Sequence, residues 1–283
     1  MCNVKNCIAK EGAGLKLKRY SVLWYFLLSL YLYPAYGQFT PGKLAVLVVG
    51  DGSGTLTSAA TIVSIKEFDF SSGSQTGTLV TTLPSSAVGG TGVFDRALTQ
   101  SGTATSEGFL NLSSDRRFLT LVGYNTGAGT AAVASSNAAT FPVNTRVIGR
   151  INANGTPDTK TTLFTAHSGT AIRSAITING SAYWTAGAPG TVGIGYVQQG
   201  NVNAATNLSA VNSRGIGIFN NQLYTTTGAG SNRLAKVGNG LPVTGTQALA
   251  NLPGFLTTTG DPYSYVFIDL DGNGSPDVLY VAS

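Results

Sequence analysis

The sequence predicts an all-β protein made of short antiparallel strands. From Gln38 onward, short runs of β-branched and aromatic residues each end at Gly, Asn or Asp, a pattern typical of strands separated by tight turns. No segment of this region carries apolar residues at three- and four-residue spacing over a helical length. The chain also has 37 glycines and 10 prolines among its 283 residues, which indicates many turns.

A separate N-terminal segment, residues 1–37, has the pattern of a secretory signal peptide. The basic stretch "KLKR" precedes an apolar run over residues 21–37, and the small residues Ala35 and Gly37 match a peptidase site before Gln38. An uncleaved signal anchor is the alternative, and its positive flank would keep the N-terminus in the cytoplasm. We therefore expect a secreted, extracellular protein, membrane-anchored through residues 21–37 only if the leader stays attached.

Residues 38–283 are expected to form the mature domain, and their charges are almost balanced. The formal net charge is +5, but residues 1–37 carry five basic residues against one acidic residue, and the rest carries 12 against 11. A nucleic-acid-binding surface needs basic residues clustered on the folded domain, so this partner class is disfavoured. Cys2 and Cys7 both lie in the leader, so the mature chain has no disulfide framework and no catalytic thiol.

The strand-like runs follow one another along the whole mature domain. In chain order they are "KLAVLVVGDGSG", "GTLVTTLPSS", "RFLTLVGYNTG", "RVIGRINANG", "TLFTAHSG", "IRSAITINGSAYWTAG", "GIGIFNNQLYTTTG" and "YSYVFIDLDGNGSPDVLYVAS". Asn-Asn in "IFNNQLY" and Asn-Gly in "TINGSAYW" predict tight hairpins, because both pairs tolerate the positive φ of such turns.

An irregularly spaced sequence repeat predicts how these strands are grouped into sheets. A polar turn, two bulky residues, a short β run and a small residue recur near Phe118, Tyr183, Leu223 and Leu279, at separations of 65, 40 and 56 residues. These separations lie around the ~40–50 residues of a propeller blade, a four-stranded meander. We therefore expect a propeller-like array of short antiparallel sheets, either complete or incomplete at the C-terminus. A sandwich or a β-solenoid is the alternative, and the irregular spacing disfavours the solenoid.

Several of these segments resemble one family of proteins. "FTPGKLAVLVVGDGSG", "RALTQSGTATSEG", "RVIGRINANG", "NQLYTTTGAG" and "DLDG…DVLYVA" are similar to a poorly characterised secreted family, common in bacteria, that begins near "FTPGNLVV-RVGDG" and looks like β-propellers. The resemblance spans nearly the whole mature chain and implies a propeller-like fold, but no established activity. Its members usually continue beyond "LYVAD" with more strands, and such strands would close the ring.

The segment "DLDGNGSPD" is the strongest candidate for a metal site. Oxygen-bearing residues occupy positions 1, 3, 5, 7 and 9 of a calcium-type loop, namely Asp269, Asp271, Asn273, Ser275 and Asp277. Position 12, where an EF-hand has Glu, is Tyr280, and both flanks read as strands. The loop is similar to the calcium loops of integrin-type propeller repeats, so we expect one structural calcium ion. A metal-free Asp/Asn/Gly turn is the alternative.

No other motif provides a defined site. "VVGDGSG" has glycines at 50, 52 and 54, but Thr55 breaks the dinucleotide pattern and a strand-like run follows. His167, the single histidine, has no nucleophile elbow nearby, and a structural or solvated role is expected. Carboxylate pairs for glycoside chemistry cannot be selected from Asp51, Glu67, Asp69, Asp95, Glu107, Asp115 and Asp158.

The sparse arginines and abundant aromatic residues each allow two interpretations. We expect the following arginines to cap turns and solvate the surface, with convergence on a central channel as the alternative: Arg96, Arg146, Arg150, Arg173 and Arg214. The 12 Tyr and 12 Phe residues suit either a sheet core or carbohydrate stacking. These features together predict a secreted, non-catalytic binding or structural module for a glycan or a protein. A carbohydrate-active hydrolase or lyase with its site in a central propeller pocket is the alternative.

Overall fold

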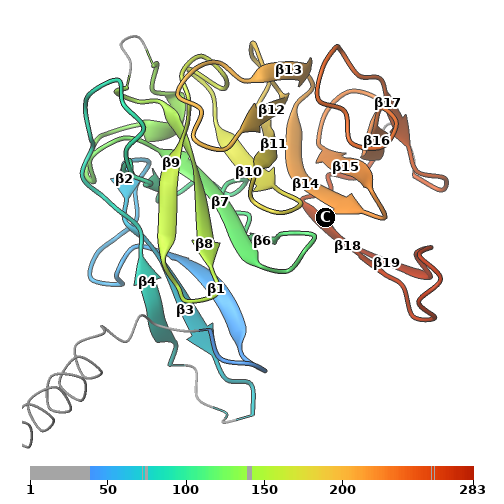
Figure 1. The fold of residues 1–283 in the computed structure, drawn as a ribbon, viewed down its shortest axis with the longest axis horizontal. Helices are drawn as coiled ribbons and strands as arrows, with labels where there is room; N and C mark the ends of the chain where they lie inside the picture. The colour runs from blue at the N-terminus through green and yellow to red at the C-terminus, as the bar shows by residue number, and fades with distance from the viewer. Residues whose placement is uncertain (1–38, 72, 74–75, 139–141, 256, 258) are drawn as a thin grey trace, which may run out of the picture. The chain divides into compact units, whose positions relative to one another are not determined.

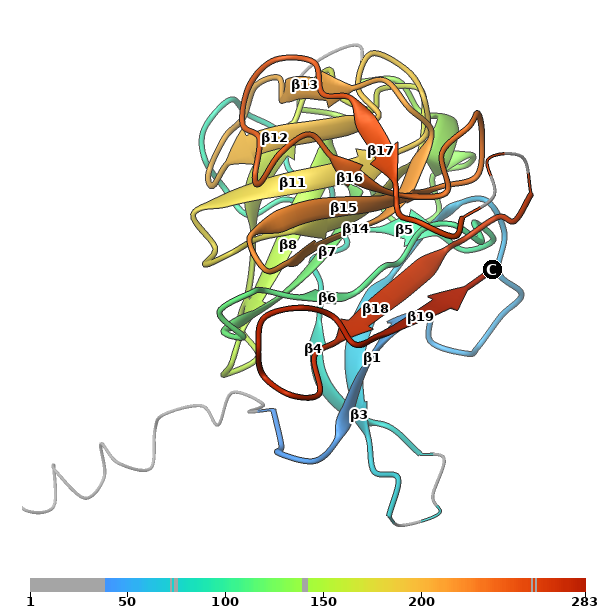
Figure 2. The same ribbon diagram turned by 90° about the vertical axis from the view of Figure 1, so that its right-hand side faces the viewer.

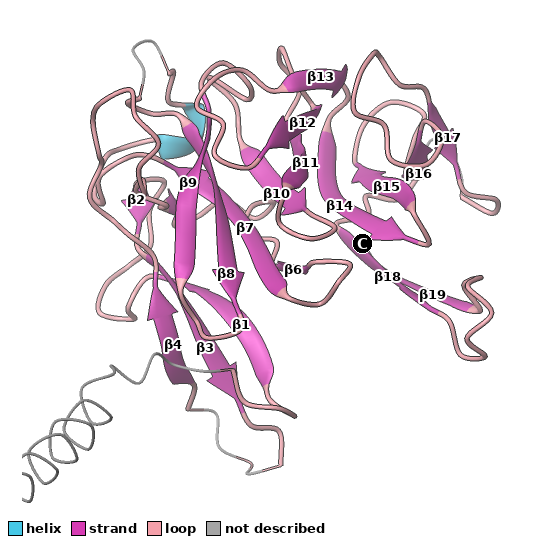
Figure 3. Cartoon of the chain, in the orientation of Figure 1, coloured by secondary structure: helices cyan, strands magenta, loops and turns pink. Residues whose placement is uncertain are grey.

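The computed structural model describes residues 39–71, 73, 76–138, 142–255, 257 and 259–283. The predicted signal peptide or anchor, residues 1–37, lies outside the described residues. In the compact unit Gly37–Ser283, strands carry the regular structure (Figure 3). One short 3₁₀ helix, η2 (Val133–Ser135), lies among the described residues. None of the described helical segments has the length and hydropathy that a membrane crossing requires. The all-β prediction is confirmed.

The N-terminal part of this unit contains two small sheets. The first has the order β1-β3-β4 and a two-stranded sheet pairs β2 with β5. Their bounds are β1 (Leu44–Val49), β2 (Ala60–Thr61), β3 (Val63–Phe68), β4 (Thr78–Thr82) and β5 (Gln100–Ser101). Residues of β3 are alternately buried and half-buried, as expected for a strand with one face in a core.

Three four-stranded meanders follow, and each keeps its strands in chain order (Figure 1). The first contains β6 (Asn111–Leu112), β7 (Phe118–Tyr124), β8 (Arg146–Asn152) and β9 (Pro157–Leu163). The second contains β10 (Ile172–Ile176), β11 (Ala182–Gly187), β12 (Ile194–Gln198) and β13 (Thr206–Ser209). The third contains β14 (Ser213–Phe219), β15 (Gln222–Thr227), β16 (Leu234–Val237) and β17 (Leu249–Asn251). All pairings within them are antiparallel.

The last sheet is a hairpin of β18 (Ser264–Ile268) and β19 (Val278–Ala282). Figure 2 shows this hairpin as two long strands joined by a wide loop. The strand prediction on both sides of "DLDGNGSPD" is therefore confirmed. No sheet closes on itself, and among the described residues neither strand of this hairpin pairs with the first sheet.

Apolar side chains fill the space between consecutive sheets. Leu121 and Val122 of β7 belong to different core clusters, because neighbouring strand residues point to opposite faces. Leu121 packs with Val63 and Ile65 of the first sheet, whereas Val122 packs with residues of β10–β12. A third cluster joins Trp184 of β11 to side chains of β14–β16. The first two four-stranded sheets are thus packed on both neighbours.

The two predicted hairpins differ in width. Phe219 pairs with Gln222 across Asn220 and Asn221, whose φ angles are 44° and 55°, so the tight Asn-Asn turn is confirmed. The Asn-Gly hairpin is wider than predicted, because five residues separate β10 from β11. There the Thr177 hydroxyl accepts the Gly180 N–H at 2.8 Å, and this side-chain bond replaces ladder hydrogen bonds.

Candidate functional site

The loop Asp269–Asp277 brings three of the predicted ligands together. The carboxylates of Asp269, Asp271 and Asp277 each offer an oxygen, and these atoms lie within 4.8 Å of one another. Two ligand oxygens on one Ca²⁺ are separated by at most about 5 Å, because each bond is about 2.3–2.6 Å long. The donor set of three hard carboxylates therefore fits calcium, and these residues would hold it.

Backbone N–H groups hold this loop in shape. Asp269 accepts the N–H groups of Gly272 and Gly274 at 2.7 and 2.8 Å, and Asp277 accepts that of Leu270 at 2.7 Å. The Gly274 hydrogen bond is the main cause that lowers the pKa of Asp269. A carboxylate ionised at neutral pH is the form that binds a cation.

The other two predicted ligands are engaged within the loop. Asn273 donates its amide to Asp271 at 2.8 Å, and its oxygen accepts the Ser275 N–H at 2.7 Å. The described structure therefore groups the three aspartates but leaves Asn273 and Ser275 as loop-forming residues. A bound ion would have to compete with these hydrogen bonds for the Asn273 oxygen.

Calcium is expected to raise the melting temperature of the protein, because an ion that binds only the folded state stabilises it by an amount that grows with the logarithm of the ion concentration above Kd. At a hundredfold excess over Kd the gain is about 2.7 kcal/mol. Asp271→Asn is expected to abolish the effect. Asp51→Asn is the matched control, because Asp51 is also exposed and its carboxylate accepts the N–H of Ser53, two residues later in the chain. Thermal melts with calcium and with chelator check this, and identical curves for the native protein would contradict the calcium site.

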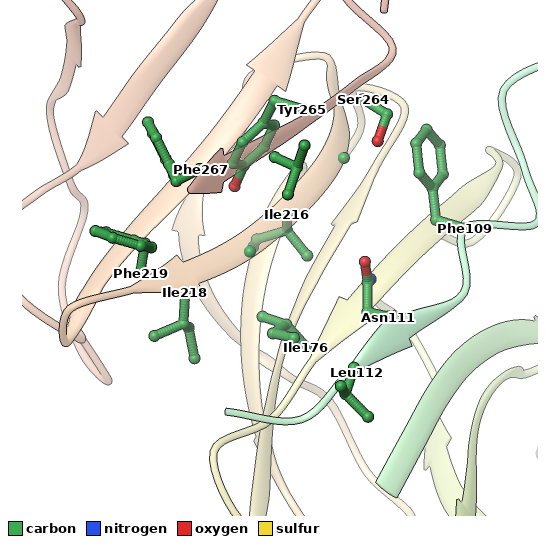
Figure 4. Close-up of a pocket in the computed structure, with 13 residues that line it drawn as sticks. Phe109, Asn111, Leu112, Ile176, Ile216, Ile218, Phe219, Ser264, Tyr265 and Phe267 are labelled. Carbon is green, nitrogen blue, oxygen red and sulfur yellow. The ribbon is translucent and has the colours of Figure 1, made fainter. Parts of the chain in front are cut away.

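A groove runs between the first strands of the later sheets (Figure 4). Its volume is about 230 Å³. Four segments form its walls: the stretch around β6, the end of β10, most of β14 and most of β18. The residues labelled in Figure 4 are Phe109, Asn111, Leu112, Ile176, Ile216, Ile218, Phe219, Ser264, Tyr265 and Phe267.

The groove is mixed in polarity and lacks acid–base groups. Its lining combines aromatic rings with the amide of Asn111 and the hydroxyl of exposed Ser264. Tyr265 is its one titratable side chain; burial raises the pKa of this phenol well above its usual value, and its hydroxyl donates to the Tyr224 carbonyl at 3.0 Å. Phe267 packs on Phe219 with ring centroids 5.1 Å apart. The groove therefore offers stacking and neutral hydrogen bonds.

Charged residues gather where the first strands of these sheets begin. Glu107 precedes β6, Arg173 lies in β10, Arg214 lies in β14 and Asp261 precedes β18. The Tyr124 hydroxyl donates to Glu107 Oε1 at 2.6 Å, and the Ser101 N–H donates to Oε2 at 3.3 Å. Burial raises the pKa of Glu107. Both carboxylate oxygens thus have protein donors, which is the arrangement of a structural carboxylate.

Two of the arginines predicted to lie on the surface are fully buried. Arg96 and Arg146 each have 0% relative exposure, so that expectation is wrong for them. The Arg146 guanidinium donates to the carbonyls of Ser136, Asn144 and Thr170 at 2.6–2.8 Å, and to that of Ala134 at 3.3 Å. Arg96 likewise donates to four loop carbonyls. The turn-capping part of the prediction is correct, but the caps are internal.

Arg233 is a further buried arginine that was not among the candidates selected from the sequence. This side chain is 6% exposed and donates to the carbonyls of Gly230, Asn232 and Thr259. A sequence pattern marks these positions. Arg96, Arg146 and Arg233 each follow Asp, Thr or Asn and precede a small or apolar residue.

The other candidate residues lie apart from one another. His167 is fully buried, so its role is structural and not solvated. Glu67 accepts the N–H and hydroxyl of Thr40. Three more carboxylates form ion pairs with basic residues, namely Asp95 with Lys160, Asp115 with Arg117 and Asp158 with Arg150. Among the described residues, the acidic group that could hold a metal is that of the Asp269–Asp277 loop.

The nucleotide interpretation of "VVGDGSG" has no structural support. The residues after Gly54 lead into β2 and β3 and not into a helix, so the phosphate-binding helix N-terminus of such motifs is missing here. Comparison with known proteins adds no assignment: no protein-family model matches the chain, and no curated protein matches it significantly.

Proposed function

We propose that the mature domain is a secreted, non-catalytic binding module and that its groove takes a glycan. The single observation that carries the proposal is the lining of the groove, which joins aromatic rings to an amide and a hydroxyl without a carboxylate, imidazole or amine. Sugars present apolar ring faces and neutral hydroxyls, and aromatic residues stack on such faces while amides and hydroxyls satisfy the polar edges.

The proposal includes a β-propeller-like arrangement in which the sheets are successive blades, whether or not the ring is complete. Hydrogen bonds between neighbouring sheets support it. The Asn111 amide donates to the Ser174 hydroxyl at 2.8 Å, and the Thr226 hydroxyl donates to the Tyr263 carbonyl at 2.9 Å. In a propeller the first strand of each blade faces the axis, so the groove would be part of the axial channel, where ligands of such folds bind.

Secretion and calcium complete the proposal. The leader of residues 1–37 would direct export and be removed before Gln38, and the balanced charge of the mature domain disfavours nucleic acid as a partner. The calcium ion would be structural, because the carboxylates that would hold it also order the β18–β19 loop. That loop follows Phe267 and Ile268, at the end of the strand that forms one wall of the groove.

The rival function is a carbohydrate-active hydrolase or lyase with its site in the same pocket. It would need two carboxyl groups at the groove, about 5–9.5 Å apart, for hydrolysis. The groove lining contains no carboxylate. Of the two carboxylates in the charged cluster, Glu107 has both oxygens hydrogen-bonded to the protein and Asp261 is paired with Arg214. These contacts favour binding over hydrolysis.

A glycan-array screen of the purified protein, with and without calcium, tests the proposed function. We expect binding to one glycan class, and stronger binding with calcium because the ion orders the loop beside the groove. Incubation of the bound glycan with the protein and analysis of chain length forms the second arm. The absence of binding under both conditions would contradict the glycan proposal, and shortened glycan would support the hydrolase or lyase instead.

A further inference from the structure

Two arginines at one end of the groove have unused hydrogen-bond donors. Arg173 lies at a register shift of β10, and Arg214 lies at a register shift of β14. Such bulges re-aim side chains and are common beside binding sites. The two groove-lining residues Gly215 and Ser264 immediately follow Arg214 and Tyr263, so the arginine pair lies at the end of the groove where these strands begin.

Each guanidinium makes its hydrogen bonds to the start of the next sheet through one nitrogen, and the Arg214 guanidinium also lies over the Tyr263 ring, 4.2 Å from its centroid. Arg173 Nη1 donates to the Asn212 side-chain oxygen at 2.6 Å and to the Ser213 carbonyl at 2.9 Å. Arg214 Nη1 is paired with the Asp261 carboxylate. Because Asn212 and Ser213 directly precede Arg214, the Arg173 guanidinium lies against the segment that carries the second arginine.

Among the described residues, no hydrogen-bond acceptor contacts the remaining nitrogens of the pair. The Nε atoms of Arg173 and Arg214 are buried without a hydrogen-bond partner in the described structure. Their Nη2 atoms also make no hydrogen bond to a described residue, but unlike the Nε atoms they are not fully buried. The Nη2 groups are therefore the donors of the pair that a ligand can reach, and guanidinium groups form strong charge-assisted hydrogen bonds to the oxygens of a carboxylate or sulfate.

The charges around the arginine pair favour an anionic ligand. Three guanidinium groups, those of Arg146, Arg173 and Arg214, face two carboxyl groups, those of Glu107 and Asp261. After burial, the charge of Arg214 is the next cause that lowers the pKa of Arg173, so the two cations repel each other. Gly228 leaves space for Arg214, because a Cβ on that glycine would lie 2.7 Å from the Arg214 Cζ.

We propose that Arg173 and Arg214 together bind an oxyanion of the ligand, so that the groove takes an acidic glycan. This inference rests on the proposed function. The neutral rings of the glycan would lie along the aromatic and amide walls, and a uronate carboxylate or a sulfate ester would meet the arginine pair. An anion between the two guanidinium groups satisfies their free donors and offsets their repulsion.

The test compares acidic and neutral forms of the same glycans by isothermal titration calorimetry. Oligogalacturonate and its methyl ester test the carboxylate, and dextran sulfate and dextran test the sulfate ester. The native protein is expected to prefer the acidic form of at least one pair by about tenfold or more. Arg173→Gln/Arg214→Gln is expected to remove that preference and leave weak binding to the neutral form.

Two further variants keep the result interpretable. Arg117→Gln changes an arginine whose side chain is 69% exposed in the β6–β7 turn and is expected to keep the preference. Arg173→Lys/Arg214→Lys keeps both charges and is expected to retain only part of it, because lysine lacks the two-pronged donor edge. The double lysine variant also tests the inference if the double glutamine variant does not fold. Equal binding of acidic and neutral forms would overturn this inference alone, whereas no binding to any glycan would overturn the proposed function as well.

Discussion

Replacing Arg146 with methionine is expected to lower the free energy of unfolding by about 3–5 kcal/mol, the cost of breaking a buried charged network. All four carbonyls would lose the guanidinium as a donor, and among the described residues only that of Ser136 would keep another donor, the Gly169 N–H; a polar group left without a partner out of reach of water costs about 1–3 kcal/mol. The guanidinium also lies over the Tyr124 ring, 4.9 Å from its centroid. Burial lowers the pKa of Arg146 to about 10. The guanidinium therefore remains charged at neutral pH and needs its hydrogen-bond acceptors.

Chemical denaturation of Arg146→Met, with Arg117→Met as the matched control, checks this prediction. The Arg117 side chain is exposed and its ion pair to Asp115 spans 3.8 Å, so the control is expected to change stability by less than about 0.5 kcal/mol. A loss below 1 kcal/mol for Arg146→Met would show that the loops around Ser136 and Thr170 are held without the guanidinium.

Acidification from pH 7 to pH 4.5 is expected to remove about 2–3 kcal/mol of stability through His167 alone, at 1.36 kcal/mol for each pKa unit. Burial lowers the pKa of His167 to about 3, with Arg146 and Arg173 as further causes. The unfolded chain therefore takes up a proton at this residue below about pH 6.5, whereas the folded protein does not. The stabilisation is complete above the unfolded pKa and is lost as the pH falls toward 3.

His167→Asn isolates this contribution. Asparagine tolerates the positive φ of 57° at this position and does not titrate, so the variant is expected to lose most of the slope between pH 6.5 and 4.5. Carboxylates with lowered pKa, such as Asp51 and Asp269, are present in both proteins and cancel in the comparison. Parallel stability curves for the native protein and the variant would contradict a buried neutral His167.

Local features were the ones that the sequence could predict. The Asn220–Asn221 turn was predictable because two consecutive asparagines between strand-like runs need no distant contact to specify a hairpin. The three aspartates of the Asp269–Asp277 loop were also predictable, since spacing within nine residues brings their oxygens together once the flanks form a hairpin. The β-strands themselves follow from short β-branched runs between turn residues.

Features that depend on packing between sheets were not predictable from local pattern. Arg146 reads as a polar residue at a strand start, and its burial depends on carbonyls from loops up to 24 residues away in sequence. The groove likewise joins residues from Phe109 to Phe267, and no local pattern marks them as neighbours. Arg173 and Arg214 were candidates for convergence on a channel, but their unused donors depend on where Asn212 and Asp261 lie.

Calorimetric titration of a glycan found on the array into Ser264→Trp tests the central claim, that the groove is the ligand site. Ser264 is exposed and lines the groove, so an indole there is expected to fill the space and weaken binding by about tenfold or more without unfolding the protein. Ser231→Trp, in the exposed loop between β15 and β16, is expected to bind like the native protein. Unchanged affinity in a folded Ser264→Trp would contradict the account.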